Sequence, residues 1–261
     1  MDSFFTLDAW VQTLILSVIT WLLTTLGALT IFFIKKSNEG VINFLLALSA
    51  GIMIASAIFS LIIPSIEQSR QLYSLPFLVP SLGLLLGGLF VVIGDVILDR
   101  TLERKIENCQ SKKRSILMLF AITLHNIPEG MCIGVAIAGA KLGGMATINS
   151  AIMLALGIGI QNLPEGASVS LPLISENVPK WKAFLYGSLS GIVEPIFAVI
   201  ACIFAINISN ILPFLLSFSA GAMICVSCTE LISESCKYSK NLASIGLITG
   251  FFIMMILDLM F

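Results

Sequence analysis

Eight apolar stretches follow one another along this chain, separated by short polar segments, and no other feature constrains its fold as strongly. They cover residues 10–34, 41–64, 77–98, 115–140, 148–173, 183–206, 212–232 and 242–261. A helix rises about 1.5 Å per residue, so each stretch is long enough to cross a hydrocarbon core of about 30 Å. Inside lipid, every backbone polar group needs a partner within the protein, which favours helices. The sequence therefore predicts an all-α polytopic membrane protein with eight transmembrane helices in one domain, residues 1–261.

Composition and charge determine the expected class and orientation. Hydrophobic residues make up 57% of the chain and charged residues 11%, whereas about a quarter of a soluble domain is charged. An outside N-terminus places all but Arg70 and Lys141 of the 14 Lys and Arg residues on the cytoplasmic side, in line with the positive-inside rule. We therefore expect a multi-pass protein of the plasma membrane, or bacterial inner membrane, with both termini outside and a cytoplasmic loop at about residues 99–114.

Polar residues recur in the middle of three of these stretches. A six-residue motif reads HNIPEG at residues 125–130 and returns as QNLPEG at residues 161–166. The sixth stretch adds Glu194, followed by Pro195. A charged side chain at the membrane centre costs about 2.5 to 3.5 kcal/mol even on mild scales, so three carboxylates at matching depth indicate a functional site.

The spacing within each motif brings metal-binding groups to one helix face. Residues i and i+4 lie on the same face, which pairs His125 with Glu129 and Gln161 with Glu165. Imidazole, carboxylate and amide groups together suit divalent transition metals. The predicted site holds two ions between the fourth, fifth and sixth spans. Its candidate ligands are His125, Asn126, Glu129, Gln161, Asn162, Glu165 and Glu194.

Other interpretations of these acids stay open at this stage. The motifs are also compatible with proline kinks whose polar side chains hold helices together, or with a cation exchanger or channel. An intramembrane hydrolase is disfavoured, because a zinc protease needs two histidines on one helix and this chain contains one. We expect no enzyme activity, no cofactor, and neither nucleic acid nor nucleotide as partner. The net charge of −1 lies in short clusters, and no phosphate-binding G-x-x-x-x-G-K-S/T loop occurs.

The two motifs, followed by VEP at residues 193–195, closely resemble those of the ZIP family of divalent-metal transporters, and Gln161 resembles its GufA-like bacterial branch. The resemblance covers nearly the whole chain. It implies one metal site made of His125, Glu129, Gln161 and Glu165. It implies a second made of Asn126, Asn162 and Glu194, with Glu129 and Glu165 shared between the two. It also implies that a homodimer imports Zn²⁺, and often Fe²⁺, Mn²⁺ or Cd²⁺, into the cytosol by an elevator-like movement.

A second repeat bears on the arrangement of the helices. Residues 49–54 read SAGIMI in the second stretch, and residues 219–224 read SAGAMI in the seventh, which crosses in the opposite direction. Small residues mark close helix crossings in any case. We also expect an inverted repeat, spans 1–3 against spans 6–8, around a central pair of spans 4 and 5. Such repeats permit alternating access to a midplane site.

Polar residues outside the motifs suggest a route to and from the site. Met53, Ser56 and Ser60 follow one stripe of the second span, and Glu67 lies near its outer mouth. At the inner end, Glu230 and Glu234 are possible exit ligands, although the histidine that many relatives carry before the first of them is absent here.

Two further side chains bear on selectivity. Gln161 supplies an amide oxygen where many relatives supply a second imidazole, which predicts a relaxed preference for Zn²⁺ that admits Fe²⁺, Mn²⁺ or Cd²⁺. Cys132 follows Glu129 by three residues and either faces the same site or packs as a small apolar side chain. We expect packing.

Overall fold

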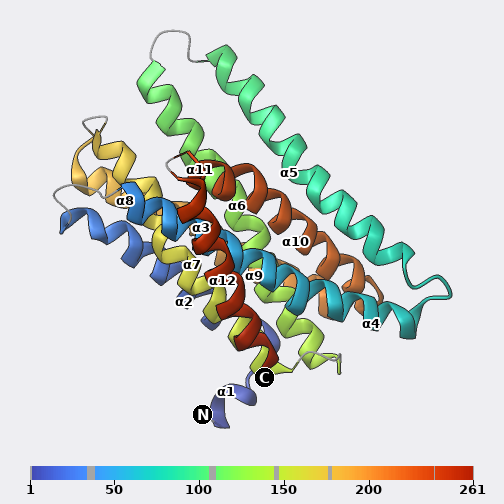
Figure 1. The fold of residues 1–261 in the computed structure, drawn as a ribbon. Helices are drawn as coiled ribbons and strands as arrows, with labels where there is room; N and C mark the ends of the chain where they lie inside the picture. Colours follow the sequence, from blue (N-terminus) through green and yellow to red (C-terminus); the bar gives the residue numbers. More distant parts are fainter. Residues whose placement is uncertain are drawn as a thin grey trace.

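Helices form every element in the described part of the chain. The computed structural model describes residues 2–33, 39–105, 110–143, 147–175, 178–237 and 239–260. The elements are α1 (Asp2–Phe5), α2 (Ala9–Leu29), η1 (Thr30–Phe32), α3 (Glu39–Ser56), η2 (Ala57–Ile62), α4 (Ile63–Leu72), α5 (Leu78–Lys105), α6 (Gln110–Lys141), α7 (Ile148–Ser175), α8 (Lys180–Ser190), α9 (Val193–Asn207), η3 (Ser209–Ile211), α10 (Leu212–Val226), η4 (Ser227–Ile232), α11 (Ser233–Ser235) and α12 (Lys240–Leu259). Figure 1 shows them as a bundle of long helices.

Six helical segments within the described residues are long and apolar enough to cross a membrane. They are Ala9–Phe32, Asn43–Leu72, Leu78–Ile97, Lys180–Asn207, Leu212–Ser235 and Lys240–Leu259. The helices α6 and α7, which carry the two polar motifs, contain 32 and 28 residues and are not among these six. The all-α polytopic membrane class is therefore confirmed, whereas the expected number of eight spans stays a prediction.

Two details of the expected spans differ from the structure. Residues 99–105 and 110–114, expected within a cytoplasmic loop, are helical, because α5 continues to Lys105 and α6 begins at Gln110. The sixth expected span is two helices, since α8 ends at Ser190 and α9 begins at Val193. This break lies immediately before Glu194, so the carboxylate occupies the first turn of α9.

Four helix pairs make the most extensive contacts: α3 with α12, α10 with α5, α2 with α7, and α6 with α9. The two SAG repeats lie in the first two of these pairs. A Cβ on Gly51 would lie 2.0 Å from the Leu247 carbonyl oxygen of α12, and one on Gly221 would lie 2.0 Å from the Leu84 carbonyl oxygen of α5. Glycine thus lets the backbones touch at both crossings, as small residues do in membrane helix pairs.

A π-helical turn follows each SAG repeat. η2 begins at Ala57 and η4 begins at Ser227, at the same distance in sequence from Gly51 and Gly221. Such turns are rare and occur frequently at functional sites. Ser60 lies in η2, and its hydroxyl donates a hydrogen bond to Asp258 of α12.

The bundle has central helices and peripheral ones. The spans that contain α3 and α10 are central, with 67% and 61% of their most apolar parts buried. The spans of α5 and α12 are peripheral: only 22% is buried, and they present apolar side chains outward. Both chain termini lie toward the same end of the bundle (Figure 1), where Lys141 Nζ at the end of α6 donates to the Phe5 and Leu7 carbonyl oxygens. The polar motifs of α6 and α7 lie inside this bundle.

Candidate metal centre

The two copies of the polar motif lie on adjacent helices and are joined by a hydrogen bond. Gln161 Nε2 of α7 donates to Glu129 Oε1 of α6 over 2.7 Å. Both side chains are buried, with 1% of their surface exposed. Glu165, one turn after Gln161, is also buried, and its charge and that of Glu194 act on Glu129. The i, i+4 spacing therefore directs both glutamates into one region between the helices.

Three side chains donate hydrogen bonds to the Glu194 carboxylate. Asn162 Nδ2 lies 3.0 Å from each of its two oxygens, Thr20 Oγ1 donates to Oε2 over 2.7 Å, and Thr24 Oγ1 donates to Oε1 over 3.4 Å. The first turn of α9 adds the positive end of a helix dipole, which favours negative charge there. These contacts bring α2, α7 and α9 together at one buried anion.

The glycine that ends each motif explains how the helices approach so closely. A Cβ on Gly130 would lie 2.3 Å from the Glu194 carbonyl oxygen, and one on Gly166 would lie 2.0 Å from the Thr24 carbonyl oxygen. Real Cβ atoms do not approach backbone atoms to this distance, so both positions need glycine. The motif therefore combines the polar groups of the site with the helix crossings that position them.

Four buried oxygens of the two motifs have no hydrogen-bond partner among the residues that the structure describes. They are Asn126 Oδ1, Glu129 Oε2, Gln161 Oε1 and Asn162 Oδ1. An unsatisfied buried acceptor costs about 1 to 3 kcal/mol, and more when it is charged. Asn126 uses its amide nitrogen to donate to the Ser190 carbonyl oxygen over 2.9 Å, which leaves its oxygen available. Carboxylate and amide oxygens are ligands for divalent cations, so a cation placed among them would satisfy all four.

The structure describes the side chains of six of the seven predicted ligands, all of them buried, and joins four of them in two hydrogen-bonded pairs. The side chain of His125, the seventh, lies outside the described residues. Among the described side chains, no group of three or more His, Cys, Asp and Glu residues is close enough together to hold a metal ion. The available donors are instead carboxylates interleaved with amides, in the pairs Gln161–Glu129 and Asn162–Glu194.

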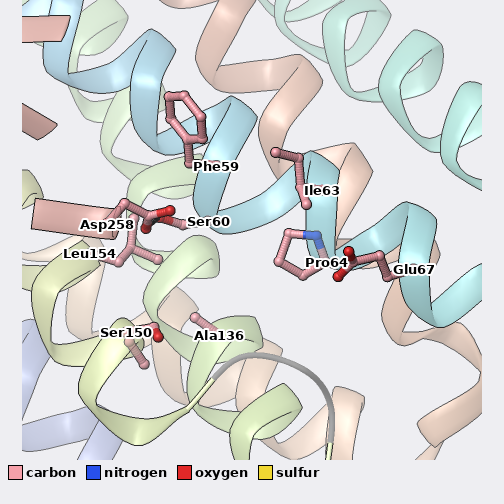
Figure 2. A pocket seen from close by; sticks show the side chains of 10 residues that line it. Phe59, Ser60, Ile63, Pro64, Glu67, Ala136, Ser150, Leu154 and Asp258 are labelled. Carbon is pink, nitrogen blue, oxygen red and sulfur yellow. Dashed lines mark hydrogen bonds between the residues drawn. The ribbon is translucent and has the colours of Figure 1, made fainter. Parts of the chain in front are cut away.

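A pocket of about 260 Å³ lies between this cluster and the end of the bundle that carries the termini. Its wall includes Ser60 and Glu67, both predicted from the sequence, and Asp258, which was not. Ser60 Oγ donates to Asp258 Oδ1 over 2.6 Å. Figure 2 shows Pro64 and Glu67 farther along the same run of helix, on α4. The sequence carried a signal for Asp258, because it is the only charged residue in the last apolar stretch.

The remaining predicted pathway residues divide into buried and exposed groups. Met53 and Ser56 are fully buried in α3, and Ser56 Oγ has no hydrogen-bond partner. Glu230 is half-buried in η4. Glu234 is exposed and forms an ion pair with Lys237 at the end of α11. The structure thus places Met53 and Ser56 inside the bundle and Glu234 at its surface.

Comparison with known proteins assigns the family. The model of the ZIP zinc transporter family matches residues 100–258, which include both motifs and Glu194. The chain belongs to the ZIP family. Zinc transporter ZIP11 of Xenopus tropicalis is 33% identical, and the alignment covers 95% of this chain and 96% of that protein. Zinc transporter GufA of Myxococcus xanthus is 33% identical over 94% of this chain and 97% of its own.

Other ZIP relatives agree with this assignment. Zinc transporter ZupT of Clostridium perfringens is 31% identical, over 95% of each chain. The resemblance noted from the motifs is thereby confirmed, including the similarity to GufA. ZIP proteins are transporters and not enzymes, so the hydrolase interpretation is set aside.

Proposed function

We propose that this ZIP protein imports divalent transition-metal ions, Zn²⁺ foremost, into the cytosol through the cluster between α6, α7 and α9. The observation that carries the proposal is the set of four unpartnered oxygens on Asn126, Glu129, Gln161 and Asn162. Three buried carboxylates lie beside them, and a divalent ion would offset the repulsion between their ionised forms. The relatives that are named zinc transporters support Zn²⁺ as the first ion to test.

The two motifs would hold two ions. His125, Glu129, Gln161 and Glu165 would bind the first, and Asn126, Asn162 and Glu194 the second, with Glu129 and Glu165 bridging as in closely spaced two-metal sites. In support, Gln161 and Asn162 are adjacent on α7 and donate to different carboxylates, Glu129 and Glu194. A mixed oxygen and single-imidazole donor set would also accept Cd²⁺, Fe²⁺ or Mn²⁺.

The route and driving force complete the proposal. Ions would enter by the pocket that contains Ser60, Glu67 and Asp258 and would leave past Glu230, while Glu234, paired with Lys237, contributes at most surface charge. An inside-negative potential of about 100 mV favours each charge by about 2.3 kcal/mol, which amounts to about 4.6 kcal/mol for a divalent ion. No nucleotide is needed.

We also propose that the helices form eight spans with an inverted repeat, so that transport proceeds by alternating access. The lengths of α6 and α7 support two further spans. The pair α3–α12 corresponds to α10–α5 when spans 1–3 are exchanged with spans 6–8. The pair α2–α7 corresponds to α9–α6 when spans 4 and 5 are exchanged as well. The matching π-helical turns η2 and η4 support the same relation.

The proposed setting is a homodimer in the plasma membrane, or bacterial inner membrane, with both termini outside. The outward apolar face of α5, which includes Leu85, Leu89 and Ile93, suits either lipid or a second copy. Cysteine accessibility at Asp8 and Lys237 would test the orientation, since the two positions are expected on opposite sides.

Metal flux into proteoliposomes tests the function. The purified full chain should give saturable Zn²⁺ influx, and Glu165→Ala should abolish it, because the mutation removes the carboxylate shared by both proposed ions. Asp8→Asn is the matched control, since it removes a charge at the exposed N-cap of α2 and should leave influx unchanged. Unchanged influx in Glu165→Ala would move the pathway away from the motifs. Flux of Na⁺ or Ca²⁺ without Zn²⁺ would favour an exchanger or channel.

A further inference from the structure

Two sulfur atoms meet beside the metal centre. Cys132 Sγ of α6 donates to Met223 Sδ of α10 over 2.9 Å, and both side chains are fully buried. Cys132 lies one turn after Glu129 on the same helix. Both sulfurs also belong to the apolar core of the bundle, so the contact with the thioether adds to ordinary packing.

The sulfur pair lies on the approach from the outer pocket to the metal centre. Ala136 of α6 forms part of the wall of the pocket that contains Glu67 and Asp258. Ala136, Cys132 and Glu129 follow one another at spacings of four and three residues, which places them on one face of α6. A cation that moves along this face from Ala136 to Glu129 therefore passes Cys132.

An unpartnered oxygen beside the sulfurs indicates a ligand rather than packing alone. Ser219 lies on α10 one turn before Met223, is fully buried, and has its hydroxyl within hydrogen-bond reach of the Cys132 thiol. Glu129 Oε2, one turn before Cys132 on α6, has no hydrogen-bond partner among the described residues. A cation between α6 and α10 would satisfy this oxygen while it contacts the two sulfurs.

We propose that Cys132 and Met223 form a sulfur subsite that raises the preference of the transporter for thiophilic divalent ions, Cd²⁺ above Zn²⁺. The inference rests on the proposed function, because it concerns ions on their way to Glu129. Thiolate and thioether ligands select soft metals, whereas the oxygens of the main cluster do not. Binding releases the thiol proton to water.

The geometry needs only a small adjustment. Two sulfurs on one tetrahedral ion, at metal–sulfur distances of about 2.3 Å or slightly more, lie about 4 Å apart. The observed 2.9 Å therefore has to open by about 1 Å. Methionine has three flexible side-chain bonds and adapts to such changes without backbone movement.

Selectivity and direct binding test the subsite. In proteoliposomes, Cys132→Ala and Met223→Leu should each lower the ratio of Cd²⁺ to Zn²⁺ uptake by about tenfold, the lower end of what loss of one supporting group costs a metal site. Cys132→Ser keeps the volume of the side chain and guards against a folding defect. Cys202→Ala is the matched control, because Cys202 is equally buried in α9 without a sulfur neighbour among the described contacts, and it should keep the ratio of the wild type.

Ultraviolet absorption distinguishes metal binding by Cys132 from mere packing, because packing of the thiol produces no absorption band with Cd²⁺. In a protein whose Cys109, Cys225, Cys228 and Cys236 are replaced by serine, Cd²⁺ should produce a cadmium–thiolate charge-transfer band, which the further change Cys132→Ser should remove and Cys202→Ala should keep. If the wild type carries Zn²⁺ while all variants keep its ratio and the band, the sulfur subsite is wrong and the proposed function stands. If the wild type carries neither ion, the proposed function fails, and the subsite with it.

Discussion

The hydroxyl of Thr20 should determine metal affinity without touching the metal. It lies 2.7 Å from Glu194 Oε2 and 2.9 Å from the Ser17 carbonyl oxygen, and since it has one proton, the charged carboxylate is the stronger acceptor. The bond orients the carboxylate toward the metal centre, and removing a group that orients a metal ligand typically costs about 10- to 100-fold in metal affinity. Thr20→Val should therefore weaken Zn²⁺ binding about 10- to 100-fold.

Two other threonines on α2 should affect Zn²⁺ binding less than Thr20 does. Thr24 Oγ1 lies 3.4 Å from Glu194 Oε1, at the limit of a hydrogen bond, so Thr24→Val should cost less than Thr20→Val. The Thr25 hydroxyl bonds instead with Ser188 Oγ over 2.8 Å, so Thr25→Val should leave binding unchanged. Isothermal titration of the purified proteins with Zn²⁺, together with KM for influx, ranks the three variants by their loss of Zn²⁺ affinity. Equal losses at Thr20 and Thr24, or a large loss at Thr25, would refute the role of the Glu194 contacts.

Three further perturbations follow from the structure. Gln161→His should change the ranking of transported metals toward Zn²⁺, since it replaces an amide oxygen with an imidazole nitrogen, and competition uptake assays would show this. Gly166→Ala should lower the thermal stability in detergent because its Cβ would lie 2.0 Å from the Thr24 carbonyl oxygen, whereas Gly139→Ala, with its nearest atom at 3.6 Å, should be tolerated. Asp258→Asn should reduce influx at low Zn²⁺ concentration more than at saturation, because it removes charge from the outer pocket but not from the metal centre.

Short-range patterns in the sequence predicted the features that depend on helix period and on lipid. The apolar stretches predicted helices. The i, i+4 spacing predicted that Glu165 shares a helix face with Gln161, and Glu129 with His125. The sequence did not predict that helix continues through residues 99–105 and 110–114 of the expected cytoplasmic loop, because charged residues can continue a helix into water and hydropathy does not detect its end. The break before Glu194 was also missed, since Gly191 and Pro195 alone do not say where a helix stops.

The sequence by itself determined the membrane class, the positions of the buried acids and the family to which the motifs belong. It did not determine which groups meet. Only the tertiary structure paired Asn162 with Glu194, brought Asp258 to Ser60, and placed the sulfur of Met223 against Cys132. Each of these contacts joins residues far apart in sequence. The physical reason is that helix period orients side chains locally, whereas the partner of each face depends on which backbones approach closely. Close glycine contacts, such as that of Gly130 with the Glu194 carbonyl oxygen, set which helix faces meet, and they form only when the whole bundle is packed.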